Sequence, residues 1–344
     1  MRFAIIGSGA IARMHSSSIN ELEGAELDAV VDIDKNRARE FAEQYGCKNY
    51  YDDYREMLKK SNADIVSVCT PSGMRESIVL DCARAGKNII VEKPVEIKLD
   101  RIDRMIAACR ENGVKLTCIY NTRYKEAHSF IKKAISSGRT GRLINGNAYI
   151  RWYRPDEYYS SSKWRGTWEL DGGGALMNQG IHTVDLLQWY MGDVESVFAY
   201  TGTLLHKSIE VEDTAIAAVK FQNGAIGTIV AATSIYPGFP TKLEITGETG
   251  TIEVSEGNIE VWNFKNSAEM DREVHAYIHS TIEGNRASDP MAFSNDCHKK
   301  QIAGFIDAVE NNTEPEINGE EARKAVQIIL AIYESARTGK EIKL

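Results

Sequence analysis

The chain of 344 residues is long enough to form two domains, each with a sizeable core. Hydrophobic residues make up 43% and charged residues 26%, which is ordinary for a soluble globular protein. The formal net charge of −8, without a long run of like charges, argues against nucleic acid or an anionic membrane as the main partner. An anionic ligand would have to be met by a local cluster of arginines or by helix N-termini.

Six scattered cysteines show no C-x-x-C spacing, which predicts buried free thiols in a reducing compartment. No apolar run approaches the roughly 18 residues that a membrane helix needs. The apolar part of the opening MRFAIIGSGA is too short for a signal peptide. We therefore expect a soluble, cytoplasmic protein without a bound metal.

Short β-rich runs alternate with helical patterns over the first 120 residues. Strands are predicted at Phe3–Ile6, Leu27–Val31, Ile65–Val68, Asn88–Val91 and Lys115–Ile119. Helical patterns lie between them, at Lys35–Tyr45, Arg75–Ala85 and Arg101–Asn112. This alternation predicts a doubly wound parallel sheet with helices on both faces.

The pattern changes after Ile119, where a helix at Glu126–Ser136 precedes a series of strands. These are predicted at Leu143–Tyr153, Val194–Leu204, Thr214–Phe221, Ala225–Ser234, Lys242–Ile245, Thr251–Val254 and Ile259–Phe264. Gln222-Asn223-Gly224 is a strong hairpin signal between two of them. Two helices close the chain, at His298–Asn311 and Glu320–Thr338. We therefore expect an α/β protein with a nucleotide-binding domain at residues 1–120. Residues 121–344 would form an α+β domain with an antiparallel sheet, whose terminal helix can pack back on the first domain.

The opening segment contains the pattern G-x-G-x-x-A between the first predicted strand and a helix. Gly7 allows the tight turn, Gly9 lets a pyrophosphate approach the backbone, and Ala12 lets the helix lie close to the strand. Asp32 stands at the end of the second strand, where an acid can bind the adenosine ribose hydroxyls. Together these features predict a dinucleotide site.

Acidic residues at the second strand bear on the choice of dinucleotide. Asp32 and Asp34 would repel a 2′-phosphate, which favours NAD over NADP. Lys35, Arg37 and Arg39 could bind such a phosphate, but they fit more simply on the solvated face of a helix. NAD is therefore the expected cofactor.

The tripeptide Glu92-Lys93-Pro94 follows the predicted strand that ends at Val91. Ligands of a doubly wound sheet bind beyond the carboxyl ends of its strands, so Lys93 is expected near the nicotinamide end of the cofactor. The alternative is a surface turn with a solvated lysine, which the topology disfavours. A cis peptide bond before Pro94 would turn the ammonium group inwards.

Three glycines, Gly172–Gly174, precede a largely apolar run that carries an asparagine and a histidine. The pattern predicts a helix from the glycines to about Met191, with Asn178, His182 and Asp185 on one face. The other faces are apolar, so the helix should be buried and its polar stripe should find partners. His182 is either a satisfied core histidine or a catalytic residue, and the space cleared by the glycines favours catalysis.

These motifs resemble the Gfo/Idh/MocA oxidoreductases, a family that includes glucose–fructose oxidoreductase and inositol dehydrogenase. The resemblance extends over nearly the whole chain and includes G-x-G-x-x-A, E-K-P, TPSG at Thr70–Gly73 and G-G-G-x-L-x-x-x-G-x-H-x-x-D. It implies a Rossmann domain followed by a domain with a large open, mainly antiparallel sheet, whose exposed face forms homodimers or homotetramers. It also implies hydride transfer between a secondary alcohol of a sugar and the nicotinamide.

The resemblance implies roles for individual residues. Lys93 would hydrogen-bond the reacting oxygen and His182 would act as general base, and which of them takes the proton stays open. Cofactor contacts are implied for Gly7, Gly9, Ala10, Ile11, Ala12, Asp32, Thr70, Pro71, Ser72, Glu92 and Lys93. Two positions depart from the family pattern. Asn178 stands where many members have Asp, so a carboxylate that could tune His182 is missing. Arg75 stands where many have His, and would either contact a phosphate or be solvated.

Arginines and aromatic residues crowd the segment RWYRPDEYYSSSKWRGTWEL before the glycines. Guanidinium groups suit phosphates or carboxylates and aromatic rings suit sugars or bases, although a solvated structural loop is the alternative. This loop and NQGIH resemble the UDP-N-acetylglucosaminuronate 3-dehydrogenase subgroup. That likeness implies oxidation of the C3 hydroxyl of a UDP-N-acetyl-hexosamine or its uronate. The expected substrate contacts are Asn121, Arg123, Arg151, Tyr153, Arg154, Tyr159, Trp164, Arg165, Asn178, Gln179 and His182.

Other functions stay open. An inositol, free-sugar or sugar-acid dehydrogenase would leave the arginine-rich loop unexplained. An NAD-dependent glycosidase, in which the oxidation is transient, also occurs in this superfamily. A non-catalytic sensor of NAD and a sugar is a further alternative, although such sensors can lose the lysine that this chain retains.

Overall fold

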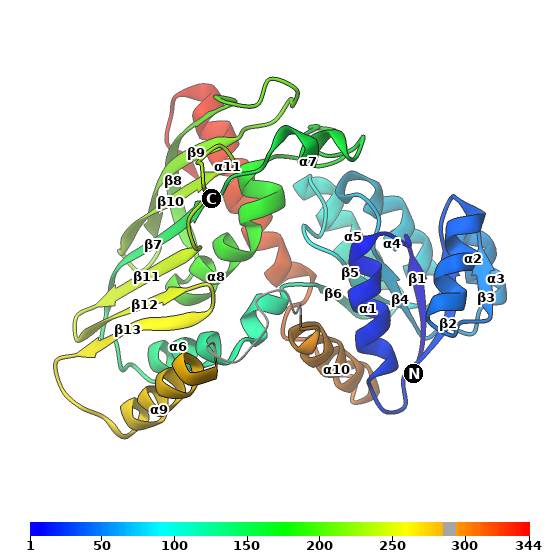
Figure 1. Cartoon of the computed structure of the whole chain (residues 1–344), viewed down its shortest axis with the longest axis horizontal. Coiled ribbons are helices and arrows are strands. Elements are labelled where there is room, and N and C mark those ends of the chain that lie inside the picture. Colours follow the sequence, from blue (N-terminus) through cyan, green and yellow to red (C-terminus); the bar gives the residue numbers. More distant parts are fainter. Residues whose placement is uncertain (285–293) are drawn as a thin grey trace. The chain divides into compact units, whose positions relative to one another are not determined.

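The computed structural model describes residues 1–284 and 294–344, which divide into two compact units (Figure 1). Unit 1 consists of Met1–Asn121, Glu169–Gly172 and Ser294–Val326. The described part of unit 2 consists of Thr122–Trp168, 173–284 and Gln327–Leu344. The main division therefore falls next to the expected boundary at residue 120, but part of the C-terminal region returns to unit 1.

Unit 1 is built around a parallel sheet. Its elements are β1 (Arg2–Ile6), α1 (Ala10–Asn20), β2 (Glu26–Val31), α2 (Lys35–Gln44), β3 (Asn49–Tyr51), α3 (Tyr54–Lys60), β4 (Ile65–Val68), a 3-10 turn (Ser72–Met74), α4 (Arg75–Arg84), β5 (Asn88–Val91), α5 (Leu99–Glu111), β6 (Leu116–Cys118), α10 (Asp296–Glu310) and the start of α11 (Gly319–Thr338). Within the described residues, the six strands lie in the order β3-β2-β1-β4-β5-β6, all parallel. The predicted doubly wound sheet is confirmed, and its winding reverses between β1 and β4, where such folds bind ligands. The short edge strand β3 was not predicted, because three largely exposed residues carry little hydrophobic pattern.

The core of unit 1 joins segments from both ends of the chain. Phe3, Ile5 and Val30 of β1 and β2 are buried in one cluster with Ile302 and Phe305 of α10. Full burial of such a side chain stabilises the fold by roughly 1.5–3 kcal/mol. α10 packs against α1, which explains why Ser294–Val326 belongs to unit 1.

Unit 2 is built around a larger sheet, and a 3-10 helix (Asn121–Tyr124) lies where the chain first enters it. Its elements are α6 (Glu126–Ser136), β7 (Leu143–Arg151), α7 (Asp156–Ser160), a π-helical segment η3 (Ala175–Gly180), α8 (Ile181–Met191), β8 (Val194–Gly202), β9 (Thr214–Phe221), β10 (Ile226–Ala232), β11 (Lys242–Gly247), β12 (Gly250–Ser255), β13 (Asn258–Phe264), α9 (Glu269–Gly284), the end of α11 and β14 (Ile342–Lys343). Within the described residues, the eight strands lie in the order β13-β12-β11-β7-β10-β9-β8-β14. The sheet is mainly antiparallel, as predicted, but β7 and β10 pair in parallel. Hairpin signals predict neighbouring antiparallel strands, whereas this parallel pair is made by a long connection.

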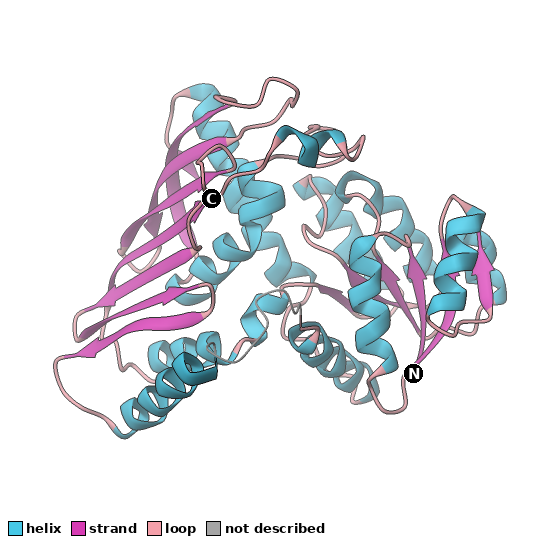
Figure 2. Cartoon of the chain, viewed as in Figure 1, coloured by secondary structure: helices cyan, strands magenta, loops and turns pink. Residues whose placement is uncertain are grey.

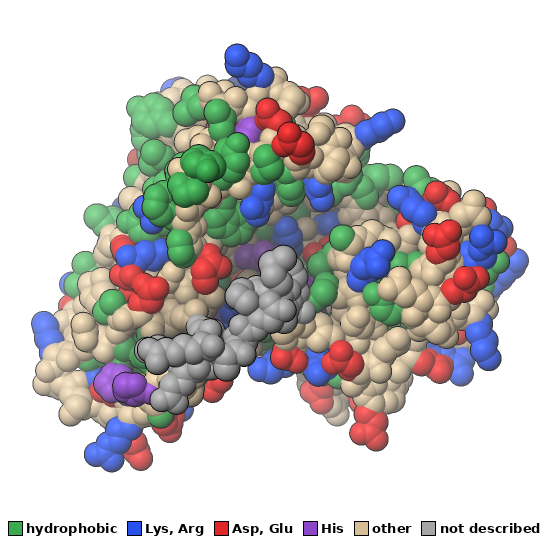
Figure 3. All heavy atoms as spheres, viewed as in Figure 1, with side chains coloured by type: hydrophobic (Ala, Val, Ile, Leu, Met, Phe, Trp, Pro, Cys, Tyr) green, Lys and Arg blue, Asp and Glu red, His purple; other side chains and the backbone are tan. Residues whose placement is uncertain are grey.

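One face of the larger sheet is apolar and exposed. Phe198 and Tyr200 of β8, Ile216 of β9 and Ile226 of β10 are 38%, 72%, 53% and 61% exposed. Hydrophobic side chains gather over this part of unit 2 in Figure 3, and α8 packs on the sheet at β7 and β11 (Figure 2). Contiguous apolar surface like this face of β8, β9 and β10 is typical of a protein interface.

Among the described residues, no helix combines the length and hydrophobicity that crossing a membrane requires.

Candidate active site

The loop between β1 and α1 has the geometry of a dinucleotide cradle. Gly7 has a φ of +96°, and a Cβ there would lie 2.9 Å from the carbonyl oxygen of Cys69, just after β4. The neighbouring strand therefore excludes a side chain at Gly7. A Cβ at Gly9 would meet no atom of the described residues within 4 Å, so the loop is open to a ligand at that point. Ala12 is buried, as close packing of α1 on the sheet requires.

Asp32 closes the other side of this loop. Its carboxylate accepts hydrogen bonds from the N–H and hydroxyl of Ser8, at 3.0 and 2.7 Å, and from the N–H of Asp34 at 3.0 Å. Arg37 pairs with it at 2.6 Å. Burial by itself would raise the pKa of Asp32, but the hydrogen bonds from Asp34, Ser8 and Arg37 outweigh burial and lower the pKa. The ionised carboxylate can accept hydrogen bonds from ribose hydroxyls.

Replacing Asp32 by alanine is expected to reduce the preference for NAD over NADP at least about tenfold, roughly 1.4 kcal/mol of discrimination. The change removes the acceptor for the ribose hydroxyls and releases Arg37, whose charge then favours a 2′-phosphate. The measurement is kcat/KM for each dinucleotide. Asp53→Ala, which removes an exposed carboxylate at the start of α3, serves as control. An unchanged ratio in the Asp32 variant would show that this carboxylate does not set the preference.

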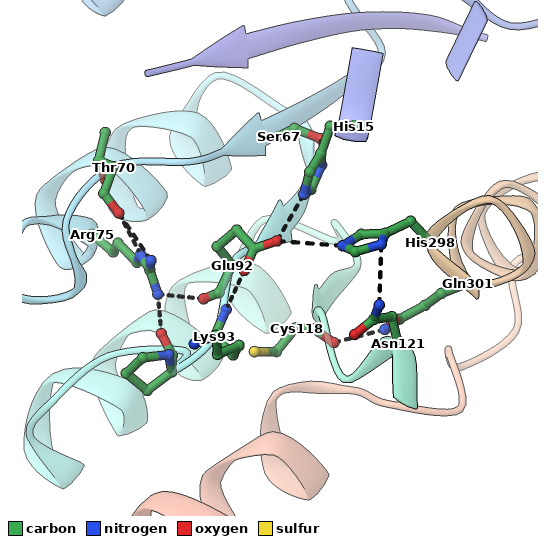
Figure 4. Close-up of polar contacts among 11 residues, drawn as sticks. His15, Ser67, Thr70, Arg75, Glu92, Lys93, Cys118, Asn121, His298 and Gln301 are labelled. Carbon is green, nitrogen blue, oxygen red and sulfur yellow. Dashed lines mark hydrogen bonds and ion pairs between the residues drawn. The ribbon is translucent and has the colours of Figure 1, made fainter. Parts of the chain in front are cut away.

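The turn after β5 carries Glu92, Lys93 and Pro94, and the Lys93–Pro94 peptide bond is cis. The Glu92 side chain is buried. Nε2 of His15 lies 2.9 Å from Oε1 of Glu92, and Nε2 of His298 lies 4.0 Å from the same atom (Figure 4). The N–H of Lys93 donates to the other carboxylate oxygen at 3.1 Å. The Glu92 carboxylate therefore connects the backbone N–H of Lys93 with two buried histidines.

His15 and Glu92 form a buried ion pair. Burial by itself would lower the pKa of His15, but Cys69 and Glu92 raise it; burial would raise the pKa of Glu92, but His15 lowers it. Burial lowers the pKa of His298 to about 4, so its ring is neutral near pH 7. Neither histidine is among the predicted site residues. His15 could have been found from its place on α1 three residues beyond Ala12, whereas His298 comes from the distant helix α10.

The structure corrects the expectation for Arg75, which was either a phosphate contact or a solvated side chain. Arg75 is 4% exposed. Its Nε and Nη2 donate to the carbonyl oxygen of Thr70 at 3.1 and 2.9 Å, and its Nη1 donates to the carbonyl oxygens of Glu92 and Pro94 (Figure 4). The guanidinium is therefore bound by backbone carbonyl groups, including those of the two residues that flank Lys93.

The remaining predicted cofactor residues also lie in unit 1. Ala10 and Ile11 begin α1, where N–H groups favour an anion. Thr70, Pro71 and Ser72 follow β4, and Ser72 is buried. The structure thus brings the predicted cofactor residues to the strand ends of one sheet, while their contacts with NAD stay predictions. Asn121, a predicted substrate contact, lies in unit 1 with its amide nitrogen 3.1 Å from Nδ1 of His298.

In unit 2, the glycine run and the following helix are organised by Glu212. A Cβ at Gly173 would lie 2.1 Å from the Tyr333 hydroxyl, and one at Gly174 would lie 2.0 Å from the Glu212 carbonyl oxygen. The Glu212 carboxylate accepts hydrogen bonds from the N–H groups of Gly174 and Leu176 and from the Tyr333 hydroxyl, at 2.9, 2.8 and 2.9 Å. Glu212 therefore caps the start of the helix. Sequence reasoning missed it, because nothing near Glu212 in the chain marks a partner so far away.

Burial raises the pKa of Glu212 to about 7, against the opposing effect of its hydrogen bonds. A carboxyl whose folded pKa exceeds its unfolded value binds its proton more tightly when folded. The free energy of unfolding should therefore fall as the pH rises from about 4.5 to about 7, by up to a few kcal/mol at about 1.4 kcal/mol per pKa unit. Glu212→Gln is expected to flatten this slope in urea unfolding measured across the range, whereas the exposed Glu260→Gln should leave it intact. An equal slope in both variants would assign the titration to another group.

The helix after the glycines differs from the single α-helix that the sequence predicts. In the π-helical segment η3, the carbonyl of Gly174 accepts from the N–H of Gln179, five residues on, at 3.4 Å. A π-turn holds more residues than an α-turn, so the spacing of Asn178 and His182 no longer places them on one α-helical face. Asn178 and His182 are half-buried, while Asp185 is fully buried. Asn178, His182 and Asp185 therefore do not form the single polar face that the sequence predicts.

Asp185 pairs with Arg123 in the interior of unit 2. Nε and Nη2 of Arg123 donate to the two carboxylate oxygens at 2.7 and 2.6 Å, and both side chains are 1% exposed. The guanidinium lies 5.0 Å from the ring centre of Trp189. Arg123 therefore has a structural role in unit 2, and its expected contact with substrate stays a prediction.

Five residues of unit 2 form what we call the arginine–amide cluster: Arg154, Tyr158, Arg165, Asn178 and Gln179. Nε and Nη2 of Arg154 donate to Oε1 of Gln179 at 3.1 and 2.9 Å. The amide nitrogen of Gln179 donates to the Tyr158 hydroxyl at 2.7 Å and to Oδ1 of Asn178 at 3.1 Å. Arg165 donates to the Tyr158 carbonyl at 3.2 Å and lies 4.5 Å from its ring centre. The structure thus joins four predicted substrate residues from two segments into one network.

The other predicted contacts of the arginine-rich loop differ in exposure. Arg151, Tyr153 and Trp164 are half-buried and lie against aromatic rings or a guanidinium of the same unit. Tyr159 is buried, and its hydroxyl lies 2.8 Å from that of Thr233. Tyr159 therefore supports the loop from inside unit 2, and its expected contact with substrate stays a prediction.

Two family models match the chain. A model described as the oxidoreductase family with an NAD-binding Rossmann fold matches residues 1–120. A model described as the GFO/IDH/MocA C-terminal domain matches residues 128–253. The first match falls in unit 1 and the second, apart from Glu169–Gly172, in unit 2, so each unit has its own family counterpart.

Solved structures and curated proteins resemble the chain over its full length. The WlbA dehydrogenase from Bordetella pertussis, solved in complex with NADH and UDP-GlcNAcA, is 34% identical, covers 100% of this chain and 98% of its own, and has a TM-score of 0.89. The WlbA dehydrogenase from Chromobacterium violaceum, in complex with the same two ligands, is 34% identical, with coverage of 100% and 96% and a TM-score of 0.90. The myo-inositol 2-dehydrogenase of Thermotoga maritima is 26% identical and covers 100% of this chain and 98% of its own length.

Proposed function

Because this chain belongs to the Gfo/Idh/MocA family of NAD-binding oxidoreductases, we propose that it oxidises the C3 hydroxyl of a UDP-N-acetyl-hexosamine or its uronate. Membership of the family and its dehydrogenase relatives establish the broader activity, an NAD-dependent oxidoreductase of sugars or polyols. The nucleotide sugar as substrate and C3 as the reacting carbon are the proposal.

The arginine–amide cluster carries the proposal. Arg154 donates to an amide oxygen and Arg165 to a carbonyl and a hydroxyl oxygen, and within the described residues neither is paired with a carboxylate. Their charge is therefore available to an anion in a chain whose net charge is −8. A diphosphate needs such guanidinium groups, whereas inositol and free neutral sugars do not. The likeness to dehydrogenases solved with UDP-GlcNAcA supports the same substrate class.

Oxidation of a secondary alcohol removes a hydride from carbon and a proton from oxygen, and NAD supplies the hydride acceptor when bound. The residues present suit this cofactor, because the loop is open at Gly9 and the ionised Asp32 lies beside it. We propose that Lys93 or His182 takes the proton that leaves the hydroxyl oxygen. Burial lowers the pKa of the Lys93 ammonium, with Arg75 adding to the effect and Glu92 opposing it. A base whose pKa lies closer to the working pH transfers a proton more efficiently.

A single-turnover assay tests the proposal. The protein at high concentration is mixed with NAD and, in separate reactions, with UDP-N-acetylglucosaminuronate, UDP-N-acetylglucosamine, myo-inositol and glucose, and NADH absorbance is followed. We expect NADH close to the enzyme concentration with a UDP-sugar alone, and a 3-keto sugar as product. Reduction by inositol or glucose alone would overturn the nucleotide-sugar assignment while keeping the family chemistry. A cleaved glycoside would indicate the transient oxidation of a glycosidase.

We also propose that the apolar face of the larger sheet joins copies of this chain into a homodimer or homotetramer. Tyr200 and Ile216 are directly paired across β8 and β9, so a charge at either site would fall in the middle of the patch. Tyr200→Glu is expected to yield monomers in sedimentation velocity, because a buried unpaired carboxylate is costly. Lys59→Glu on exposed α3 serves as the control. Assembly that survives in Tyr200→Glu would place the interface elsewhere.

We also propose that the protein is located in the cytoplasm. The free cysteines among the described residues agree with such a reducing compartment.

A further inference from the structure

Arg75 brings a positive charge into unit 1 without a carboxylate partner. The residue is 4% exposed, and within the described residues its guanidinium forms no ion pair. Its N–H groups donate to backbone carbonyls. Carbonyl oxygens satisfy the hydrogen bonds of this guanidinium, and the charges of Glu92 and Glu96 favour its protonated form without forming an ion pair with it, but burial outweighs them and lowers the pKa of Arg75. Such an arrangement is typical of sites where the charge has a function.

The hydrogen bonds of Arg75 are placed around Lys93. Glu92 and Pro94 are the two neighbours of Lys93 in the chain, and Nη1 of Arg75 donates to the carbonyl oxygens of both. Nε and Nη2 tie the same guanidinium to Thr70, in the loop after β4. A planar and rigid group therefore fixes the backbone on both sides of Lys93 to the neighbouring loop (Figure 4).

Charged and titratable groups surround Lys93 from several elements. They are Glu92 in the same turn, Arg75 of α4, Asp171 of the segment 169–172 and Cys118 of β6, with His15 of α1 and His298 of α10 behind Glu92. Burial lowers the pKa of the Lys93 ammonium and Arg75 lowers it further, while Glu92, Asp171 and Cys118 oppose this. The charge of Glu92 is already paired with His15. Glu92 still favours the protonated amine of Lys93, and Arg75 is a cation that opposes this protonation.

We propose that Arg75 is a positioning residue for the dehydrogenase reaction, a role that rests on the proposed function. Its guanidinium holds the Lys93 turn in place, and its permanent buried charge favours the neutral amine that can take a proton from the reacting hydroxyl. The two effects are separable, because lysine at this position retains a charge but cannot span three carbonyls, whereas methionine retains bulk but no charge.

The pH dependence of single-turnover NADH formation tests the proposal. Arg75→Met is expected to move the rising limb of the profile to higher pH by about one unit and to lower the rate at pH 7 about tenfold. Arg75→Lys should keep the limb near its original pH but lower the plateau, since the backbone is less well held. Arg84→Met, which removes an exposed arginine from the end of the same helix, should change neither. A uniform loss of rate in Arg75→Met without a shift of the limb would overturn the role of the charge.

A second measurement does not depend on turnover. The resonance of the Lys93 side chain in protein labelled with ¹³Cε-lysine, assigned by its loss in Lys93→Arg, gives the pKa of this amine directly. We expect that pKa to rise by about one unit in Arg75→Met and to stay unchanged in Arg84→Met. Equal values in wild type and Arg75→Met would overturn the proposal even if a sugar is oxidised. A shifted value without oxidation of any sugar would keep the role of Arg75 and reject the proposed substrate. If Arg75→Met does not fold, the titration in Arg75→Lys decides instead, where a lowered Lys93 pKa should persist.

Discussion

Replacing Lys93 by methionine is expected to slow NADH formation by about a thousandfold while leaving the Kd for NAD within about threefold of wild type. General acid–base groups contribute roughly 10²–10⁴ to rate, and methionine keeps the length of the side chain without the amine. The backbone of the turn should persist, because Glu92 and Arg75 bind its N–H and carbonyl groups. Stopped-flow absorbance gives the rate, and protein fluorescence gives the affinity for NAD.

Lys98→Met is the matched control, because Lys98 is an exposed lysine five residues further along the same segment. It should change neither quantity. If Lys93→Met instead lost NAD binding with little further effect on the rate of bound complexes, Lys93 would be a cofactor contact and the proton transfer would belong to His182. His182→Asn measured beside it separates the two roles.

Replacing Asp185 by asparagine is expected to lower the free energy of unfolding by roughly 3–5 kcal/mol, because it leaves the Arg123 guanidinium buried without its counter-charge. Both side chains are 1% exposed and joined by two short hydrogen bonds, so solvent cannot replace the lost partner. The measurement is urea unfolding followed by tryptophan fluorescence.

The double variant Arg123→Met with Asp185→Leu should recover most of that loss, since two apolar side chains of similar volume often replace a buried pair at little cost. Glu195→Gln, which breaks the exposed pair with Lys220, is the control and should change stability by at most about 1 kcal/mol. A loss below about 1 kcal/mol in Asp185→Asn would mean that water reaches Arg123.

Features that depend on neighbours in the chain could be predicted from the sequence. The parallel sheet follows from alternating strand and helix patterns, and the cradle at Gly7 and Gly9 follows from a motif of a few residues between a strand and a helix. The position of Lys93 follows from the end of its strand, at the edge where such sheets bind ligands, while its role in the reaction stays a proposal.

Features that depend on distant segments could not be predicted in the same way. Glu212 binds Gly174, which lies 38 residues away, and Arg123 pairs with Asp185 across 62 residues. The burial of Arg75 depends on carbonyl groups, which leave no mark in a sequence. The π-helical turn, which removes Asn178 and His182 from the single helical face predicted for them, has no signal in the amino-acid composition either.

The glycine run also limits how this protein can be redesigned. Tyr333 and Glu212 already occupy the volume that side chains at Gly173 and Gly174 would need, so even an added methyl group would have to displace buried atoms. Laboratory evolution toward new sugars should therefore accumulate changes in the loop at residues 151–168, apart from the buried Tyr159 and Gly166, because its other side chains are half-buried or exposed. In a mutational library, we expect most substitutions at Gly173 and Gly174 to abolish folding or activity, while many substitutions in the loop are tolerated.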